Sequence, residues 1–265
     1  MADVVGASEV SKYINAVRRL WADLVPVIDE AEKRILYAYL KVQEASPYKI
    51  SNMLGMNTAT VYRKSRRLLR ERLLISDGPR GRPRISNKGC LALYINSIIG
   101  EEALVGCFAK TWGVRVELDE LLGFLMLLAI EAKRRKLNLK TMTMCRVDEA
   151  SIHVLRFLKE AIMTYIRDGV SMASALSDTA SRHGVPPRLF IAGIRLALRG
   201  ISRTLPLTVH TDSCSIVILM HNRLLLPFVV ECKRDCEYYR TSLGLDCPRA
   251  YRRLQRHCKL VTAAT

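Results

Sequence analysis

Basic side chains are concentrated in one segment of the chain. Residues 57–90 contain ten Lys or Arg and two acidic residues, a local excess of eight positive charges. Such side chains neutralise phosphates, which supplies affinity for nucleic acid without sequence information. The segment therefore favours a polyanionic partner, with DNA as the first expectation and RNA as an alternative. A cationic helix that is only a solvated surface is the other interpretation.

The helix predicted from Thr58 to about Arg72 has discriminating residues at its start. Arg can bond bidentately to guanine and Asn to adenine, and residues early in a helix that enters the major groove reach base edges. We expect bases to be contacted by Asn57, Thr58, Thr60 and Arg63. We expect phosphates to be contacted by Lys64, Arg66, Arg67 and Arg70. The buried side of this helix is predicted to hold Val61, Leu68 and Leu69.

A short Gly/Pro turn rich in arginine follows this helix. Residues 79–83 read Pro-Arg-Gly-Arg-Pro, which resembles the core of an AT-hook. In that motif Gly lets the backbone lie deep in a narrow minor groove, and the two Arg side chains extend along its floor. We expect minor-groove contacts from Arg80 and Arg82 with A/T-rich flanks, with Arg84 beside them. Arg-rich Gly-Pro turns also occur in plain linkers.

Four of the eight cysteines lie within 27 residues near the C-terminus: Cys232, Cys236, Cys247 and Cys258. Thiolates in such a cluster bind an iron–sulfur cluster or tetrahedral zinc. Only the first pair is close, so the spacing favours a 4Fe–4S cluster, with zinc as the alternative. Two disulfides, or inert buried thiols, remain open as well. The isolated cysteines, Cys90, Cys107, Cys145 and Cys214, are expected to be core residues.

An apolar run, residues 224–230, leads into Glu231-Cys232-Lys233. A strand that ends in Glu-x-Lys resembles the third core strand of PD-(D/E)xK nucleases, and Asp212 stands before the preceding strand. The resemblance implies that Asp212 and Glu231 hold magnesium while Lys233 positions or activates the attacking water. The run between Asp212 and Glu231 is a simple hairpin, however, and a solvated ion pair at a strand end is the alternative.

The elements that position these residues follow from the hydrophobic periodicity. Residues 8–24 form an amphipathic helix, and two more helices precede the basic one, the second closed by Gly55. A hairpin of residues 73–75 with 85–86 comes next. Further helices are predicted over 88–99, 102–112, 117–137, 148–168, 171–183 and 187–202. Strands are predicted over 207–209, 215–220 and 224–230.

The order of three helices and a hairpin over residues 29–95 resembles winged helix-turn-helix regulators of the MarR, PadR and ArsR kind. In those families the third helix enters the major groove, and an Arg-rich wing touches the backbone or the minor groove. The fold class is therefore expected to be mainly α: a winged helix-turn-helix, then a helical domain, then a small C-terminal α/β cysteine-rich element. We expect four parts. Residues 1–28 form a docking or dimerisation helix and residues 29–99 the winged-helix DNA-binding domain. Residues 100–204 form a helical dimer or effector core, and residues 205–265 form the small β-hairpin with the four-cysteine segment.

Composition sets the remaining expectations. The chain of 265 residues has a formal net charge of +17. No apolar run reaches the length of a membrane helix and no secretory signal is visible, so we expect a cytoplasmic protein without a membrane partner. Two glutamines against 29 arginines are typical of proteins from hot environments, where cytosolic disulfides also occur.

Three functional hypotheses follow. The first is a sequence-specific regulator of transcription that binds double-stranded DNA as a homodimer, with two recognition helices about one DNA turn apart. The second is a DNA-processing enzyme or mobile-element factor with a nuclease-like C-terminal part. The third is an architectural or replication-associated DNA binder with little sequence preference. No phosphate-cradling Gly-rich loop is present, which argues against nucleotide hydrolysis.

Overall fold

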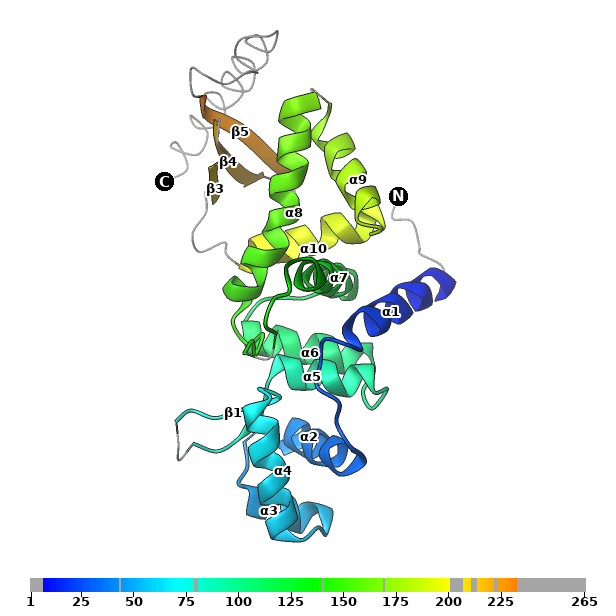
Figure 1. Cartoon of the computed structure of the whole chain (residues 1–265), viewed down its shortest axis with the longest axis vertical. Helices are drawn as coiled ribbons and strands as arrows, with labels where there is room; N and C mark the ends of the chain where they lie inside the picture. The colour runs from blue at the N-terminus through cyan, green and yellow to red at the C-terminus, as the bar shows by residue number, and fades with distance from the viewer. Residues whose placement is uncertain are drawn as a thin grey trace. The chain divides into compact units, whose positions relative to one another are not determined.

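The computed structural model describes residues 7–42, 44–78, 81–139, 141–168, 170–200, 207–210, 214–221 and 224–232. Within these residues the chain is mainly helical, with ten helices and five strands (Figure 1). It divides into two compact units, residues 1–156 with 180–200 and residues 157–179 with 201–265. None of the helices in the described residues is both long and apolar enough to cross a membrane.

Helices α2 (Glu30–Val42), α3 (Pro47–Leu54) and α4 (Thr58–Arg70) form the predicted three-helix group. Ser46 caps α3, and its hydroxyl accepts a hydrogen bond from the Lys49 amide at 3.3 Å. Gly55 ends α3 in the left-handed conformation, at φ 62°, which is easy for glycine alone because it has no Cβ. Asn57 then caps α4. The predictions that Gly55 closes α3 and that the next helix begins at Thr58 are confirmed.

A two-stranded antiparallel sheet follows α4. Strand β1 (Leu74–Ile75) pairs with β2 (Arg84–Ile85), so that Leu74 lies opposite Ile85. The segment between α2 and α3 joins this sheet edge, because Glu44 forms a bridge with Arg84 and the Ala45 amide donates to the Pro83 carbonyl at 3.3 Å. The segment after α2 is therefore tied to the hairpin of β1 and β2, which comes later in the chain than α3 and α4.

Helices α5 (Asn87–Ile95) and α6 (Glu101–Trp112) are joined by a disulfide between Cys90 and Cys107, whose Cα atoms lie 6.7 Å apart. The expectation that both are core residues is confirmed for Cys90, which is buried, whereas Cys107 is only half-buried. Sequence spacing did not reveal the pair because the two cysteines are 17 positions apart and lie on different helices. The only free thiol among the cysteines whose side chains the structure describes is Cys145, which is half-buried.

The start of α5 is held by a buried lysine. Lys88 is 2% exposed, and its ammonium donates to the Glu71 carbonyl at 3.0 Å and to the Leu139 carbonyl at 2.8 Å. Glu71 is the C-cap of α4. This basic residue therefore satisfies backbone acceptors at the end of α4 and in the loop after α7, and it is unavailable to a ligand.

The core of the first unit lies around α7 (Leu118–Arg135) and α10 (Pro187–Gly200). The two helices cross at Gly123 and Gly193, where a Cβ on either residue would collide with the backbone of the other helix. Helix α1 (Ala7–Trp21) packs on α7, with the Trp21 indole N–H donating to the Leu125 carbonyl at 2.9 Å. The predicted docking helix thus docks within its own chain.

Helices α8 (Val147–Asp168) and α9 (Met172–Arg182) each contribute residues to both units. Strands β3 (Leu207–His210), β4 (Cys214–His221) and β5 (Leu224–Cys232) form an antiparallel meander in the order β3-β4-β5. The register shifts between Ser215 and Ile216. The strands predicted from the sequence are confirmed.

Candidate nucleic-acid interface

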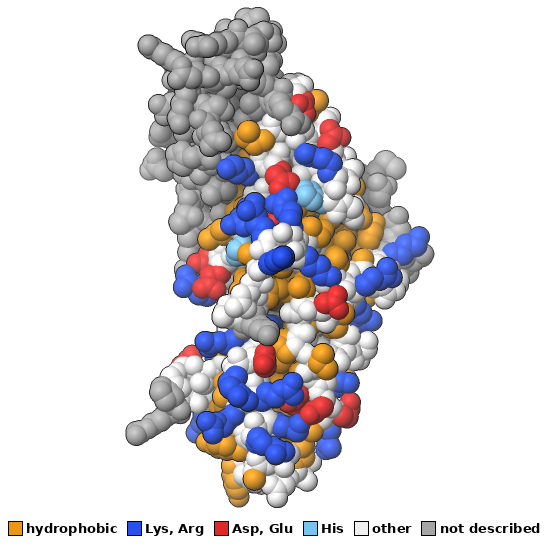
Figure 2. Space-filling model, in the orientation of Figure 1, with side chains coloured by type: hydrophobic (Ala, Val, Ile, Leu, Met, Phe, Trp, Pro, Cys, Tyr) orange, Lys and Arg blue, Asp and Glu red, His pale blue; other side chains and the backbone are white. Residues whose placement is uncertain are grey.

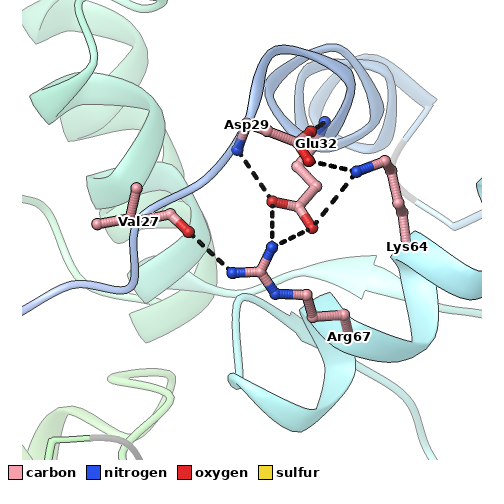
Figure 3. A network of polar contacts seen from close by, with 5 residues as sticks. All are labelled: Val27, Asp29, Glu32, Lys64 and Arg67. Carbon is pink, nitrogen blue, oxygen red and sulfur yellow. Dashed lines mark hydrogen bonds and ion pairs between the residues drawn. The ribbon is translucent and has the colours of Figure 1, made fainter.

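The five basic residues of α4 fall into two groups that face different surroundings. The side chains of Lys64 and Arg67 point towards the start of α2. There they form ion pairs with Asp29 and Glu32 (Figure 3). Glu32 is fully buried, and Arg67 Nη1 donates to its two carboxylate oxygens at 2.8 and 3.0 Å. Arg67 Nη2 donates to the Val27 carbonyl at 3.1 Å. These contacts attach α4 to α2.

Asp29 and Glu32 also form a reciprocal cap at the start of α2. The Glu32 amide donates to Asp29 Oδ1 at 2.9 Å, and the Asp29 amide donates to Glu32 Oε2 at 3.0 Å. Lys64 bonds to Asp29, and this hydrogen bond is the main cause that lowers the pKa of the Asp29 carboxyl below its ordinary value. The Asp29 carboxyl is therefore held in its charged form, and ion pairs with Asp29 and Glu32 engage two of the five cations of α4 within the protein.

The other group faces solvent. Arg63, Arg66 and Arg70 are exposed, and their side chains form no ion pair or hydrogen bond with any residue that the structure describes. They line a shallow groove along α4 together with Thr58, Ala59, Tyr62 and Leu69. We call these seven residues the open α4 face. In Figure 2, Lys and Arg side chains gather around α3 and α4, with hydrophobic atoms between them.

The residues expected to read bases are partly occupied within the protein. Asn57 Oδ1 accepts hydrogen bonds from the amides of Ala59 and Thr60, at 2.9 and 3.4 Å, as the cap of α4. The Thr58 hydroxyl lies 3.0 Å from the Ser51 hydroxyl of α3. Thr60 is half-buried. Of the four predicted readers, Arg63 alone has a side chain that is both exposed and without a partner among the described residues.

The loop between β1 and β2 carries the predicted minor-groove arginines. Arg82 is exposed, and no described residue forms an ion pair with it. Arg84 lies 3.2 Å from Asp77 and 3.9 Å from Glu44, so it braces the loop. Arg80 lies outside the described residues. The loop therefore presents Arg82 to solvent, while Arg84 has a supporting place in the hairpin.

Tyr62 is a surface residue that the sequence analysis did not single out. Its side chain is 56% exposed and lies on the open α4 face beside Arg63 and Arg66. Leu69, predicted to be buried, is only half-buried and lines the same groove, whereas Ser65 occupies the buried side. The spacing of apolar residues correctly predicted a helix here, but it did not show which residues lie at the boundary between the buried and the exposed side of α4.

Only a small part of the two candidate C-terminal sites, the four cysteines and the nuclease-like carboxylates, lies within the described residues. Cys232 is the last residue of β5, in register with Cys214 of β4, and Cys236, Cys247 and Cys258 lie outside the described residues. Glu231 is in register with Ser215, while Asp212 and Lys233 also fall outside. Within the described part of the chain, no group of three or more His, Cys, Asp or Glu residues could hold a metal ion.

Comparison with protein-family models, with curated proteins and with solved structures finds no match to this chain.

Proposed function

We propose that this chain is a sequence-specific, double-stranded DNA-binding transcriptional regulator whose helix α4 enters the major groove. One observation carries the proposal: Arg63, Arg66 and Arg70 line one exposed face of α4 and have no partner among the described residues. They span about 10 Å of helix. Guanidinium groups bind phosphate and guanine bidentately, so duplex DNA is the ligand whose charge and geometry match them.

The order of elements around α4 supports the same proposal. Helix α2, the bridge at Glu44, helices α3 and α4, and the β1–β2 hairpin follow one another as in a winged helix-turn-helix. In such a module the recognition helix follows a helix that crosses the DNA backbone. Here α3 has that place, and Lys64 and Arg67 attach α4 to α2 through ion pairs with Asp29 and Glu32. We assign residues 29–99 to this module.

The wing is proposed to add a contact in the adjacent minor groove. Arg82, together with Arg80, would extend into a narrow A/T-rich groove, where the negative potential is strongest. Arg84 is proposed to act through the hairpin, because its guanidinium is paired with Asp77. Substitution of Arg82 should therefore weaken the preference for A/T flanks more than substitution of Arg84.

The rest of the chain has proposed roles that rest on its sequence. We propose that residues 100–204 provide a dimer or effector core, since a homodimer would place two copies of α4 about one DNA turn apart. We propose that Cys232, Cys236, Cys247 and Cys258 hold a 4Fe–4S cluster, or zinc in its place, as a structural or redox-sensing site.

The proposal is tested by selecting duplexes from a randomised library with the full-length protein at moderate salt. A regulator should enrich one, roughly palindromic, site and bind it about 1,000-fold or more tightly than a scrambled duplex. Binding with no preference would identify an architectural DNA binder and contradict the proposal. Magnesium-dependent cleavage of the duplex that is lost in Glu231→Gln would identify the nuclease alternative, with Asp212 and Lys233 as the partner residues.

A further inference from the structure

An aromatic ring lies in the middle of the cationic surface of α4. Tyr62 is 56% exposed, Arg63 and Arg66 lie beside it, and Ala59 lies one turn before it on the same face. The described residues that line this groove all belong to α4. A phosphate-binding surface needs only cations. The ring of Tyr62 can therefore supply apolar contact surface to the partner, in addition to the phosphate contacts of the arginines.

Duplex DNA offers such a group at one place. In the major groove, base edges present hydrogen-bond donors and acceptors, and thymine alone adds an apolar C5 methyl group. Uracil lacks this methyl group, and the major groove of double-stranded RNA is too deep and narrow for a helix. A helix face that combines cations with an uncovered aromatic ring thus matches thymine-containing DNA better than RNA.

Hydrogen-bond reading by the neighbouring polar residues is restricted. Asn57 Oδ1 already accepts two backbone amides, and the Thr58 hydroxyl is engaged with Ser51. A bidentate Asn–adenine contact would require the cap of α4 to open. The arginines, the half-buried Thr60 and Tyr62 are the groups of the helix that can contact bases without such a change.

We infer that the open α4 face reads thymine through its methyl group, with Tyr62 as the specificity-determining residue. The inference rests on the proposed DNA-binding function and deepens it. Arg63 and Arg66 hold the backbone or a guanine on either side, and the tyrosine ring covers the methyl group. The preference is for DNA over a uracil-containing duplex of the same sequence.

The test replaces each thymine of the selected duplex by deoxyuridine, one at a time, which removes only the methyl group. We expect affinity for the full-length protein to fall roughly fourfold at one or two positions, the loss typical of one buried methyl group. Tyr62→Ala should bind the thymine and uracil duplexes equally. Tyr48→Ala is the matched control, because Tyr48 is 64% exposed on α3 but does not line the groove.

Three results would overturn the inference while leaving DNA binding intact. The wild-type protein could bind every uracil duplex as tightly as the thymine duplex, Tyr62→Ala could remain as sensitive as wild type, or the selected site could contain no thymine. Failure of the proposed function is a different result: no duplex is selected, or binding does not depend on the three arginines of the open α4 face. Circular dichroism of each variant verifies that the helices are retained.

Discussion

Removal of Arg67 should destabilise the α2–α4 pair without removing a side chain from the open α4 face. In Arg67→Met the fully buried Glu32 loses two hydrogen bonds, of 2.8 and 3.0 Å. Breaking a buried ion pair costs about 3–5 kcal/mol. Here Glu32 keeps the Asp29 amide at 3.0 Å and the Lys64 ammonium at 3.9 Å, so we expect a smaller loss. We place it at about 2 kcal/mol, since two partners of the carboxylate remain.

Amide hydrogen exchange of the full-length protein measures this loss locally. A decrease of about 2 kcal/mol in opening free energy accelerates exchange in α4 roughly 30-fold. Glu32→Gln combined with Arg67→Met should recover more than half of the loss, because the neutral amide can still accept from the Asp29 backbone. Unchanged protection in the single variant, or a double variant as unstable as the single one, would refute the role assigned to this network.

Three further predictions concern the first unit. Gly193→Ala should lower the free energy of unfolding by about 2–3 kcal/mol, since its Cβ would lie 2.5 Å from the Gly123 carbonyl carbon; Gly106→Ala is the control in thermal unfolding, because a Cβ there meets nothing within 4 Å. Burial and then a neighbouring arginine lower the pKa of His153 below its ordinary 6.5. As the pH falls, the imidazole is therefore protonated in the unfolded chain before it is protonated in the folded one. The free energy of unfolding consequently falls as the pH drops below about 6.5. Urea titrations at pH 7.5 and 5.5 should show a smaller decline for His153→Gln than for the wild-type protein. Peptide mapping without reductant should recover a cross-linked peptide containing Cys90 and Cys107, and Cys107→Ala should lower the unfolding free energy by about 3 kcal/mol.

Local signals in the sequence predicted the elements around the candidate site. Gly55 and Asn57 mark the turn between α3 and α4 because each has a conformational or capping role that few residues can perform. The period of apolar residues likewise placed α7 and α10 within a few residues of their observed bounds. These features depend on residues that are near one another in the chain, which is why the sequence was sufficient.

The sequence could not predict contacts between residues that are far apart in the chain. Lys64 and Arg67 resemble Arg63 and Arg66 in the sequence, and only the fold brings the first two to acidic residues 35 positions earlier. The same holds for Cys90, whose partner lies on another helix. Charge counting therefore overestimated the number of cations that α4 presents to solvent, and it passed over Tyr62 because exposure is a tertiary property.

The central claim is that the three arginines of the open α4 face contact the DNA. Its most direct test is the salt dependence of binding to the selected duplex, because each phosphate contact that is lost lowers the slope of log K against log salt by about 0.9. The variant with Arg63, Arg66 and Arg70 changed to Gln should lose up to about 2.7 in slope, from about 0.9 for each of three contacts.

A control of equal charge separates contact from general attraction. Lys12, Arg19 and Arg115 are exposed cations that lie outside α4, and changing all three to Gln removes the same charge. We predict that this control keeps the slope of the wild-type protein while the α4 variant loses most of its affinity. Equal reductions of slope in the two triple variants would contradict the claim, since the DNA would then respond to net charge rather than to the open α4 face.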